Sequence, residues 1–377
     1  MIDPGWFVDR VQAAGIRMFT GVPDSLLKDF GAHVMTELPR EQHVITANEG
    51  AAVGLALGHY LRTGEPALVY LQNSGFGNTV NPLLSLADPD VYGVPMLVLV
   101  GWRGQPGVKD EPQHVKQGRV QAALLDAIEV PWEVLPHDHN DADDTIARMT
   151  SAALEGNTPA VLLVEKGTFA AAASAPPPPP GTSARPSRED ALIAVVEALG
   201  DATINVSTTG MLSRELFELR ERTGADAGRD FLTVGGMGHA SSIALGVALQ
   251  ESDREVWCLD GDGALLMHLG SLAVVADHGP TNLFHVVFNN GVHDSVGGQP
   301  TSIVSVDVPG VAQASGYRYA AVTDDLAAVP RLVAELRQHG GPSLLEVQVR
   351  PGNRPDIGRP TRTPAQSKQA FMAALRT

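Results

Sequence analysis

The sequence predicts two α/β domains, each built on a doubly wound parallel sheet and joined by a proline-rich linker. Apolar runs of four to seven residues alternate with stretches of helical spacing, which is the pattern of βαβ units. Five consecutive prolines at 176–180 divide the chain into nearly equal halves. Proline fits neither a helix interior nor a central strand, so an extended spacer is expected there. The expected domains are residues 1–170 and 188–377, with residues 171–187 as the linker.

The two halves share a pattern at an offset of 188 residues. This offset aligns three pairs: 56–58 (ALG) with 244–246 (ALG), 68–72 (LVYLQ) with 256–260 (VWCLD), and Gly75 with Gly263. We interpret each ALG triplet as part of a helix of small residues packed closely on a sheet. The alignment favours an internal duplication. The alternative is that any two α/β domains look alike at this level of detail.

The composition excludes several classes of protein. A net charge of −16 without a basic stripe predicts that nucleic acid is not a partner. Cys258 is the single cysteine, which rules out an internal disulfide, fits a reducing cytoplasm and, within an apolar run, predicts a buried thiol. The acidic, proline-interrupted start does not resemble a signal peptide. No apolar run approaches the ~20 residues of a membrane span, so no membrane association is expected.

An acidic residue between two glycines follows the predicted strand 255–260. Residues 264–279 have the spacing of one helix, and the next strand, 283–290, ends in paired asparagines. Parallel strands bring Asp262 and Asn290 to one edge of the sheet, where their oxygens suit Mg²⁺. The glycines let the backbone approach a phosphate, and Gly263 would open a helix whose N-terminus attracts it. This pattern predicts a metal–diphosphate anchor; the alternative is an ordinary turn and strand end.

Gly261-Asp262-Gly263 followed by Asn289-Asn290 resembles the cofactor motif of thiamine diphosphate enzymes. The resemblance implies that Asp262, the Asn290 side chain and the main-chain oxygen of Val292 bind Mg²⁺ at the cofactor's diphosphate. Residues 43–60 resemble the segment that carries the family's cofactor-activating glutamate, here Glu49. The alternative for Glu49 is a carboxylate that favours a helix start. The halves then correspond to pyrimidine-binding and diphosphate-binding domains, without the middle domain of larger members.

Four stretches, 20–30, 68–89, 99–119 and 289–301, resemble the phosphonopyruvate decarboxylases more narrowly. The resemblance implies decarboxylation of 3-phosphonopyruvate to phosphonoacetaldehyde in phosphonate and antibiotic biosynthesis. The nearest alternative is sulfopyruvate decarboxylase, which is often two chains, so a single chain favours the phosphonate enzymes. A carboligase is a further alternative. A cofactor-binding subunit without catalysis is disfavoured because both halves carry their motifs.

The resemblance also implies acid–base residues. Asp24 resembles the proton-transferring aspartate of pyruvate decarboxylases; its alternative is a turn residue after Pro23. His114 is the second expected group, because histidine titrates near neutrality, and its alternative is a surface-loop histidine. The pattern departs from pyruvate decarboxylases, which have two adjacent histidines where this chain has Gln113-His114. It also lacks their glutamate after the asparagine pair and carries His293 and Asp294 there.

A doubly anionic substrate needs a local positive site in a net-acidic protein. The basic residues Arg103, Lys109, Lys116 and Arg119 lie within 17 residues and are expected to include substrate contacts. Interleaved Asp110 and Glu111 make a solvated loop the alternative. Ser25 and Asn73 complete the expected substrate set, with Asn73 in an amide-rich loop, 72–78.

The remaining expected cofactor contacts come from the resemblance alone: Thr208, Thr209, Gly236, Met237, Gly261, Gly263 and Ala264. Met237 takes the place of the apolar residue that bends thiamine; its alternative is a core methionine. Because family members bind the cofactor between domains of different subunits, we expect a homodimer or higher homo-oligomer with active sites at the subunit interface.

Overall fold

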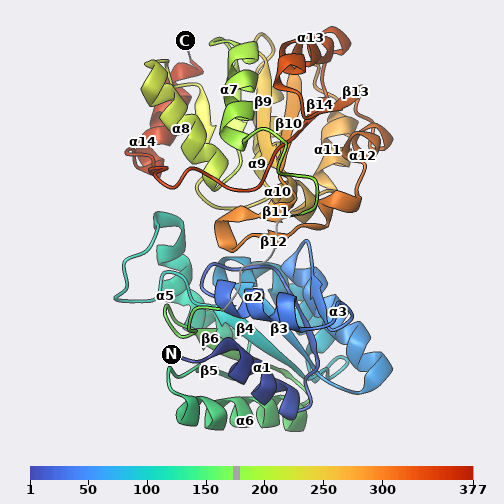
Figure 1. The fold of residues 1–377 in the computed structure, drawn as a ribbon, viewed down its shortest axis with the longest axis vertical. Helices are drawn as coiled ribbons and strands as arrows, with labels where there is room; N and C mark the ends of the chain where they lie inside the picture. Colours follow the sequence, from blue (N-terminus) through green and yellow to red (C-terminus); the bar gives the residue numbers. More distant parts are fainter. Residues whose placement is uncertain (173–178, 377) are drawn as a thin grey trace. The chain divides into compact units, whose positions relative to one another are not determined.

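The chain forms two compact units in a computed structural model, which describes residues 1–172 and 179–376 (Figure 1). Among the described residues, the first unit takes in 1–172 and 295–299, and the second takes in 179–294 and 300–376. Residues 173–178 of the expected linker lie outside the described residues, so the domain limits at 170 and 188 stay predictions. Across the described ranges, no helix is both long enough and apolar enough to cross a membrane.

The first unit is built on a six-stranded sheet in the order β2-β1-β3-β4-β6-β5, and every neighbouring pair is parallel. Its strands are β1 (Met18–Gly21), β2 (His43–Ile45), β3 (Ala67–Gln72), β4 (Met96–Gly101), β5 (Trp132–Val134) and β6 (Pro159–Val164). Its helices are α1 (Pro4–Ala13), α2 (Lys28–Glu37), α3 (Glu49–Thr63), α4 (Phe76–Pro82), α5 (Pro112–Ala127) and α6 (His139–Gly156), with short turns η1 (Asn73–Gly75) and η2 (Leu83–Ala87). One apolar core joins α1, α2 and α6 to the sheet, and a second joins α3, α4 and α5.

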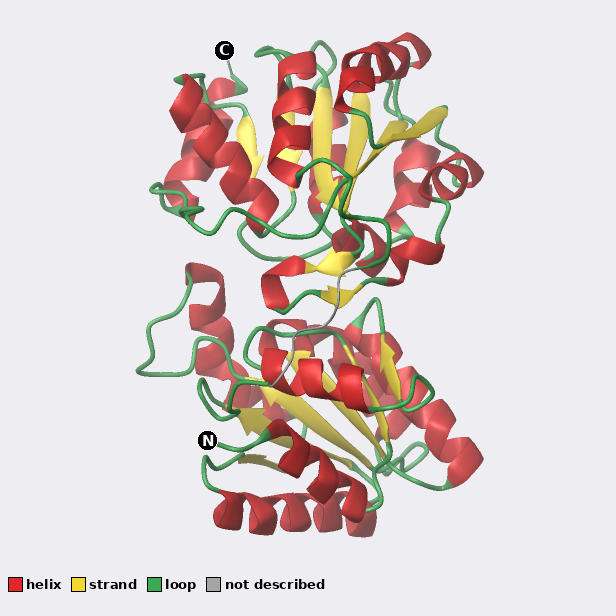
Figure 2. Ribbon diagram, in the orientation of Figure 1, coloured by secondary structure: helices red, strands yellow, loops and turns green. Residues whose placement is uncertain are grey.

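The second unit has a six-stranded parallel sheet in the order β8-β7-β9-β10-β14-β13. Its strands are β7 (Ile204–Ser207), β8 (Asp230–Leu232), β9 (Val256–Gly261), β10 (Leu283–Asn289), β13 (Tyr319–Thr323) and β14 (Ser343–Gln348), beside the short β11 (Val292–His293) and β12 (Gln299–Pro300). Its helices are α7 (Arg188–Leu199), α8 (Met211–Thr223), α9 (Ala240–Ala248), α10 (Asp262–Met267), α11 (Ser271–His278), α12 (Val308–Ala314), α13 (Val329–His339) and α14 (Pro364–Ala374). Helices cover both faces of each sheet (Figure 2).

The two main sheets have the same topology. When the strands of each are numbered along the chain, both read 2-1-3-4-6-5 across the sheet. The predicted fold class of two parallel-sheet α/β domains is therefore confirmed. The shared strand order also supports the internal duplication inferred from the 188-residue offset, because independent α/β domains adopt many different orders.

Local sequence accounts for several helix ends. Asn48, Asp138 and Ser187 cap α3, α6 and α7, each accepting a hydrogen bond from a backbone N–H of the first turn. Gly64 and Gly279 end α3 and α11 in the left-handed conformation, with φ of 73° and 53°, which glycine adopts without steric cost.

One local prediction needs correction. The helix expected over 264–279 is two helices, α10 and α11, separated at His268–Gly270, where glycine weakens helix formation. The small-residue helices α3 and α9 pack on their sheets as predicted, through buried Ala56 and Ala244. Gly58 and Gly246 face away, since a Cβ at either position would meet nothing within 4 Å.

Phe30 is expected to be a main support of the first core. Its ring lies 5.8 Å from that of Phe7, 5.6 Å from Tyr70 and 5.9 Å from Phe169, and it is fully buried. Phe30→Ala should lower the free energy of unfolding by about 3–5 kcal/mol in urea denaturation. Tyr92→Ala, which removes a ring that is 66% exposed, is the control and should change it by less than about 0.5 kcal/mol. Equal effects would contradict the assignment of this core.

Candidate active site

Both sheets place polar residues at their topological switch points, where successive connections leave in opposite directions. In the first sheet this point lies between β1 and β3, and in the second between β7 and β9. Open α/β sheets bind ligands at such points, beyond the carboxyl ends of the strands. Asp24 and Gln72 lie there in the first unit, and Thr208 and Asp262 in the second.

Glu49 begins α3 and is 5% exposed. The Asn78 amide donates a 2.7 Å hydrogen bond to Glu49 Oε2. Burial raises the pKa of Glu49, and the Asn78 hydrogen bond opposes this rise. Gly75 leaves the room that the carboxylate occupies, because a Cβ at Gly75 would lie 2.0 Å from Glu49 Oε1. Glu49 is thus a buried carboxyl group with a raised pKa, at a position where any larger residue at 75 would collide with it.

Asp24 follows β1 and is 1% exposed. The Gln72 side chain donates a 2.5 Å hydrogen bond to one carboxylate oxygen, and the Leu26 backbone N–H donates a 3.0 Å bond to the other. Burial raises the pKa of Asp24 in spite of these donors. Gly101, at the end of β4, allows this close packing, since a Cβ there would lie 1.9 Å from Asp24 Oδ2.

Arg103 is held beside Asp24 by side-chain and backbone contacts. Its guanidinium donates to both oxygens of Asp110 at 2.8 and 2.5 Å and to Ser25 Oγ at 2.8 Å. Its backbone is joined to the Asn73 side chain by two hydrogen bonds of 2.8 and 3.1 Å. Burial alone would raise the pKa of Asp110, but the bonds from Arg103 and two backbone N–H groups hold it well below its usual range.

His114 lies on α5 and is 8% exposed, and its Nδ1 has no hydrogen-bond partner among residues 1–172 and 179–376. Burial, followed by the charge of Arg103, lowers the pKa of His114. Glycine at 104 and 118 lets the loop pack against α5, because a Cβ on Gly104 would lie 1.9 Å from the His114 carbonyl oxygen. The Trp102 indole fixes the same contact with a 2.8 Å bond to the Gly118 carbonyl.

The structure separates the four basic residues of 103–119. Arg103 joins the cluster of Asp24, Ser25, Asn73 and His114. Lys109, Lys116 and Arg119 are exposed on the preceding loop and on α5, and they make no ion pair with the described residues. Their role as substrate contacts stays a prediction.

In the second unit, Asp262 and Asn290 follow the adjacent parallel strands β9 and β10, as predicted. Asp262 is 4% exposed, and Thr301 donates a 2.6 Å hydrogen bond to its Oδ2. Burial raises the pKa of Asp262 to about 7, although the Thr301 bond lowers it. Asn290 accepts a 3.0 Å bond from the Val292 backbone N–H, which fixes the turn between them.

A chain of hydrogen-bonded charged side chains supports the Asn290 side chain. Its amide donates a 2.7 Å bond to Asp294, which accepts a 3.1 Å bond from Arg188. Arg188 in turn donates to both oxygens of Glu215 at 2.9 Å. The network uses the Asn290 amide nitrogen. The Asn290 Oδ1 atom accepts one hydrogen bond from Val292 and can still bind a cation through its second lone pair.

Glycines shape the space beside Asp262. A Cβ on Gly263 would lie 3.1 Å from His293 and 3.2 Å from the Met237 methyl group. Gly236, before Met237, has a φ of 64° that favours glycine. Thr208 is buried and Thr209 partly buried after β7, while Ala264 is buried in α10. Among the expected cofactor contacts, Met237 and Gly263 are therefore neighbours.

Comparison with known proteins gives the family. Residues 5–127 match the thiamine pyrophosphate enzyme N-terminal TPP binding domain, and residues 205–347 match the C-terminal TPP binding domain. The chain is 37% identical to a phosphonopyruvate decarboxylase of Streptomyces viridochromogenes, over 100% of this chain and 96% of the relative. It is also 37% identical to one of Streptomyces hygroscopicus, over 98% of this chain and 93% of the relative. The chain belongs to the phosphonopyruvate decarboxylase family of thiamine pyrophosphate enzymes.

One argument for this family was wrong. A sulfopyruvate decarboxylase of Methanosarcina acetivorans is 26% identical over 92% of this chain and 91% of its own length. That relative therefore has both halves in a single chain, so fusion of the halves does not separate the two kinds of decarboxylase. The difference in identity, 37% against 26%, is what favours the phosphonopyruvate family.

The residues present fit a diphosphate cofactor with a divalent cation. Asp262 is a buried carboxyl group whose pKa is raised to about 7 by burial, so a cation bound there would favour its ionised form. The side-chain oxygen of Asn290, which follows the neighbouring strand, is of the type that Mg²⁺ prefers. In the other unit, Glu49 is a buried carboxyl group that can share a proton with a ring nitrogen.

Sequence reasoning missed the residues that hold the predicted ones. These are Gln72, Asn78, Asp110, Asp294 and Thr301. The amide-rich loop 72–78 was predicted to contact the substrate or the cofactor. In the structure, Gln72 and Asn78 bond to Asp24 and Glu49 instead, and Asn73 bonds to the Arg103 backbone.

Gly75→Ala is expected to displace the Glu49 carboxylate, because the added Cβ would lie 2.0 Å from it. The φ of Gly75 is −85°, so the backbone itself accepts alanine. We expect at least a tenfold loss of turnover with an unchanged circular dichroism spectrum. Gly77→Ala is the matched control, since a Cβ there would meet nothing within 4 Å. A fully active Gly75→Ala variant would contradict the position of Glu49.

Acid is expected to weaken divalent-cation binding at Asp262. The pKa of this carboxyl group is raised to about 7, so a proton competes with the cation increasingly as the pH falls below 7. The thermal stabilisation given by Mg²⁺ with thiamine diphosphate should be larger at pH 8 than at pH 6, and the apparent affinity about tenfold higher. Asp262→Asn should remove this pH dependence. An equal stabilisation of the unaltered protein at both pH values would count against the shifted pKa.

Proposed function

We propose that this protein catalyses the thiamine diphosphate- and Mg²⁺-dependent decarboxylation of 3-phosphonopyruvate to phosphonoacetaldehyde and carbon dioxide. The observation that carries the proposal is the cluster of Arg103, Asp24 and His114 at one edge of the first sheet. It combines a fixed positive charge with two buried proton-transfer groups. The 37% identity to phosphonopyruvate decarboxylases supports the same substrate.

The proposed cofactor contacts are the residues expected from the sequence. Asp262, Asn290 and the main-chain oxygen of Val292 would bind Mg²⁺, and Thr208, Thr209, Gly236, Met237, Gly261, Gly263 and Ala264 would surround the cofactor. When bound, thiamine diphosphate supplies the carbon nucleophile that attacks the 2-oxo acid and takes up the electrons left by carbon dioxide. Glu49 holds a proton at its buried carboxyl group and shares it with the pyrimidine ring.

Asp24 and His114 have environments that suit opposite roles. Burial raises the pKa of Asp24, which favours a neutral acid that donates a proton. Burial and Arg103 lower the pKa of His114, which favours a neutral imidazole that accepts one. A neutral Asp24 also avoids repulsion of a substrate that carries a carboxylate and a phosphonate.

Arg103 is the proposed contact for an anionic group of the substrate. Its guanidinium has five N–H donors, and three of them are used on Asp110 and Ser25. Two remain for a phosphonate or carboxylate oxygen, and Ser25 and Asn73 fix the group in place. Lys109 and Arg119 are proposed as further contacts from the sequence alone.

A homodimer or higher homo-oligomer with active sites at the subunit interface is also proposed. Two exposed helix faces that combine glycine with leucine support it. On α3 the exposed face carries Gly54, Gly58 and Leu61, and on α9 it carries Gly246, with exposed Leu249 directly after the helix. Small residues let backbones approach closely, and the side chains of Leu61 and Leu249 are 72% and 48% exposed. A cytoplasmic location stays the prediction made from the single cysteine.

A substrate panel tests the proposed reaction. The protein with thiamine diphosphate and Mg²⁺ is incubated with 3-phosphonopyruvate, sulfopyruvate or pyruvate, and the products are followed by NMR. We expect kcat/KM for 3-phosphonopyruvate to exceed that for pyruvate at least tenfold, because pyruvate lacks the second anion. Equal turnover of pyruvate would contradict the anion site, preferred turnover of sulfopyruvate would assign the sulfonate reaction, and ketol products would indicate a carboligase.

The same panel tests Arg103. Arg103→Gln should lower kcat/KM for 3-phosphonopyruvate by about 10- to 100-fold, the usual effect of a lost charged hydrogen bond, and change pyruvate turnover less. The matched control is Arg148→Gln, which removes an exposed arginine paired with Glu133 on the edge strand β5.

Glu49→Gln tests the activating carboxyl group. Glutamine keeps the size and the contact with Asn78 but cannot exchange a proton, so turnover should fall at least 100-fold. Binding of thiamine diphosphate, measured by isothermal titration calorimetry, should change less than tenfold. An unchanged rate would refute the role of Glu49, and loss of binding with loss of rate would indicate a purely structural role.

A further inference from the structure

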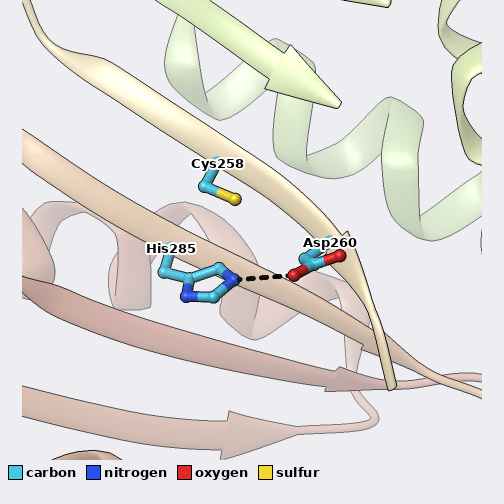
Figure 3. A group of neighbouring side chains, drawn as sticks. All are labelled: Cys258, Asp260 and His285. Carbon is cyan, nitrogen blue, oxygen red and sulfur yellow. Dashed lines mark ion pairs between the residues drawn. The ribbon is translucent and has the colours of Figure 1, made fainter. Parts of the chain in front are cut away.

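Three buried polar side chains point toward one another from β9 and β10, the two strands that precede Asp262 and Asn290 (Figure 3). Cys258 and Asp260 are on β9 and His285 is on β10, and each is 1% exposed. Their sulfur, oxygen and nitrogen atoms all lie within 4.8 Å of one another. The same face of the sheet is otherwise an apolar core with residues of α9, α11 and α12. None of these three residues takes part in the proposed chemistry.

Asp260 connects the turn to the neighbouring strand. Its Oδ1 accepts a 2.9 Å hydrogen bond from the Gly261 backbone N–H, the first residue of the Gly-Asp-Gly turn. Its Oδ2 lies 3.4 Å from His285 Nε2. In the register of the sheet His285 is opposite Cys258 and Asp260 is opposite Val287, so the contact runs diagonally from β9 to β10. One carboxylate is thus hydrogen-bonded to the Gly261 peptide and lies in 3.4 Å contact with His285 on the strand that ends at Asn289.

Burying Asp260 and His285 in an apolar core lowers the stability of the folded protein. Within the described residues neither ring nitrogen of His285 has a hydrogen-bond partner, and an unpaired buried polar group costs about 1–3 kcal/mol. A buried ion pair gives little or no net stability over apolar residues of similar size. Val256, Leu283 and Val287 occupy neighbouring positions of the same core, so apolar residues pack on this face. Stability alone therefore does not account for Asp260 and His285.

A transition-metal site is the other chemistry that these residue types allow, since zinc binds thiolate, imidazole and carboxylate. The contacts argue against it. A metal-bound histidine normally donates its other ring N–H to an acceptor, and His285 has no such partner in the described part of the chain. One oxygen of Asp260 is already used by Gly261, and burial raises the pKa of the Cys258 thiol, which disfavours the thiolate.

We propose that Asp260 and His285 are positioning residues that fix the Gly261 peptide, and through it the direction of the Asp262 carboxylate toward Asn290, for binding the divalent cation of the diphosphate. The pair links the two strands that lead to the expected ligands, because Asp260 lies on β9 two residues before Asp262, and His285 lies on β10, which leads to Asn290. This inference rests on the proposed function.

Binding of Mn²⁺ in the presence of thiamine diphosphate, measured by electron paramagnetic resonance and isothermal titration calorimetry, tests the pair without using turnover. Asp260→Ala and His285→Leu should each weaken Mn²⁺ binding about 10- to 100-fold, the usual effect of losing a group that orients a metal ligand. The double variant should bind no more weakly than the weaker single variant, because the two residues act as one unit. Cys258→Ala changes the same core without touching Gly261 and should bind Mn²⁺ within twofold of the unaltered protein.

Asp260→Asn distinguishes loss of the positioning contact from a general loss of folding. Asparagine keeps an acceptor for the Gly261 N–H and offers a donor to His285, so it should restore binding to within threefold, even if the larger changes lower thermal stability. The proposal is overturned if Asp260→Asn binds as weakly as Asp260→Ala, if Cys258→Ala weakens binding as much as His285→Leu, or if the purified protein holds one zinc per chain by mass spectrometry. If the unaltered protein itself binds no Mn²⁺ with the cofactor, the proposed function fails, which is a distinct result.

Discussion

The site in each unit depends on carboxyl groups that are buried at the carboxyl edge of a parallel sheet. Asp24, Glu49 and Asp262 are all at most 5% exposed, and burial raises the pKa of each. An uncompensated buried carboxylate is costly, so such a group either keeps a proton or acquires a cation. In the proposed function these two outcomes distinguish the units: the carboxyl groups of the first unit would exchange protons, and Asp262 of the second would bind a metal ion.

The common topology explains how one architecture serves both purposes. In each sheet the connections diverge between the first and third strands of the unit, which leaves a crevice at the strand ends. The absence of a Cβ at certain glycines then determines which side chains fit at the strand ends. Gly75 and Gly101 make room for the carboxyl groups of Glu49 and Asp24, whereas Gly263 leaves space between His293 and Met237. The two units therefore share a topology and differ in the residues that follow equivalent strands.

The sequence predicted the groups that follow strands better than the groups that hold them. Asp262 and Asn290 were predictable because parallel strands collect their carboxyl ends at one edge, whatever the loops do. The bonds Gln72–Asp24, Asp110–Arg103 and Thr301–Asp262 were not, because they depend on loop paths and side-chain directions between residues 7 to 48 positions apart. The break at His268–Gly270 was missed because apolar spacing continues across it. Membership of the family was predicted from motifs and is confirmed over the full chain.

The ion pair of Arg103 with Asp110 clarifies how an acidic protein can select a doubly anionic substrate. A free guanidinium would attract any anion, and a protein with a net charge of −16 would offer it many internal partners. Asp110 occupies two donors and Ser25 a third, so the direction of the remaining donors is fixed before the substrate arrives. Fixing them in advance lowers the entropy lost on binding. Burial raises the pKa of the neighbouring Asp24, which reduces its repulsion of an anion. In the proposed reaction, specificity for the second anion therefore depends on the orientation of one arginine rather than on a broad positive surface.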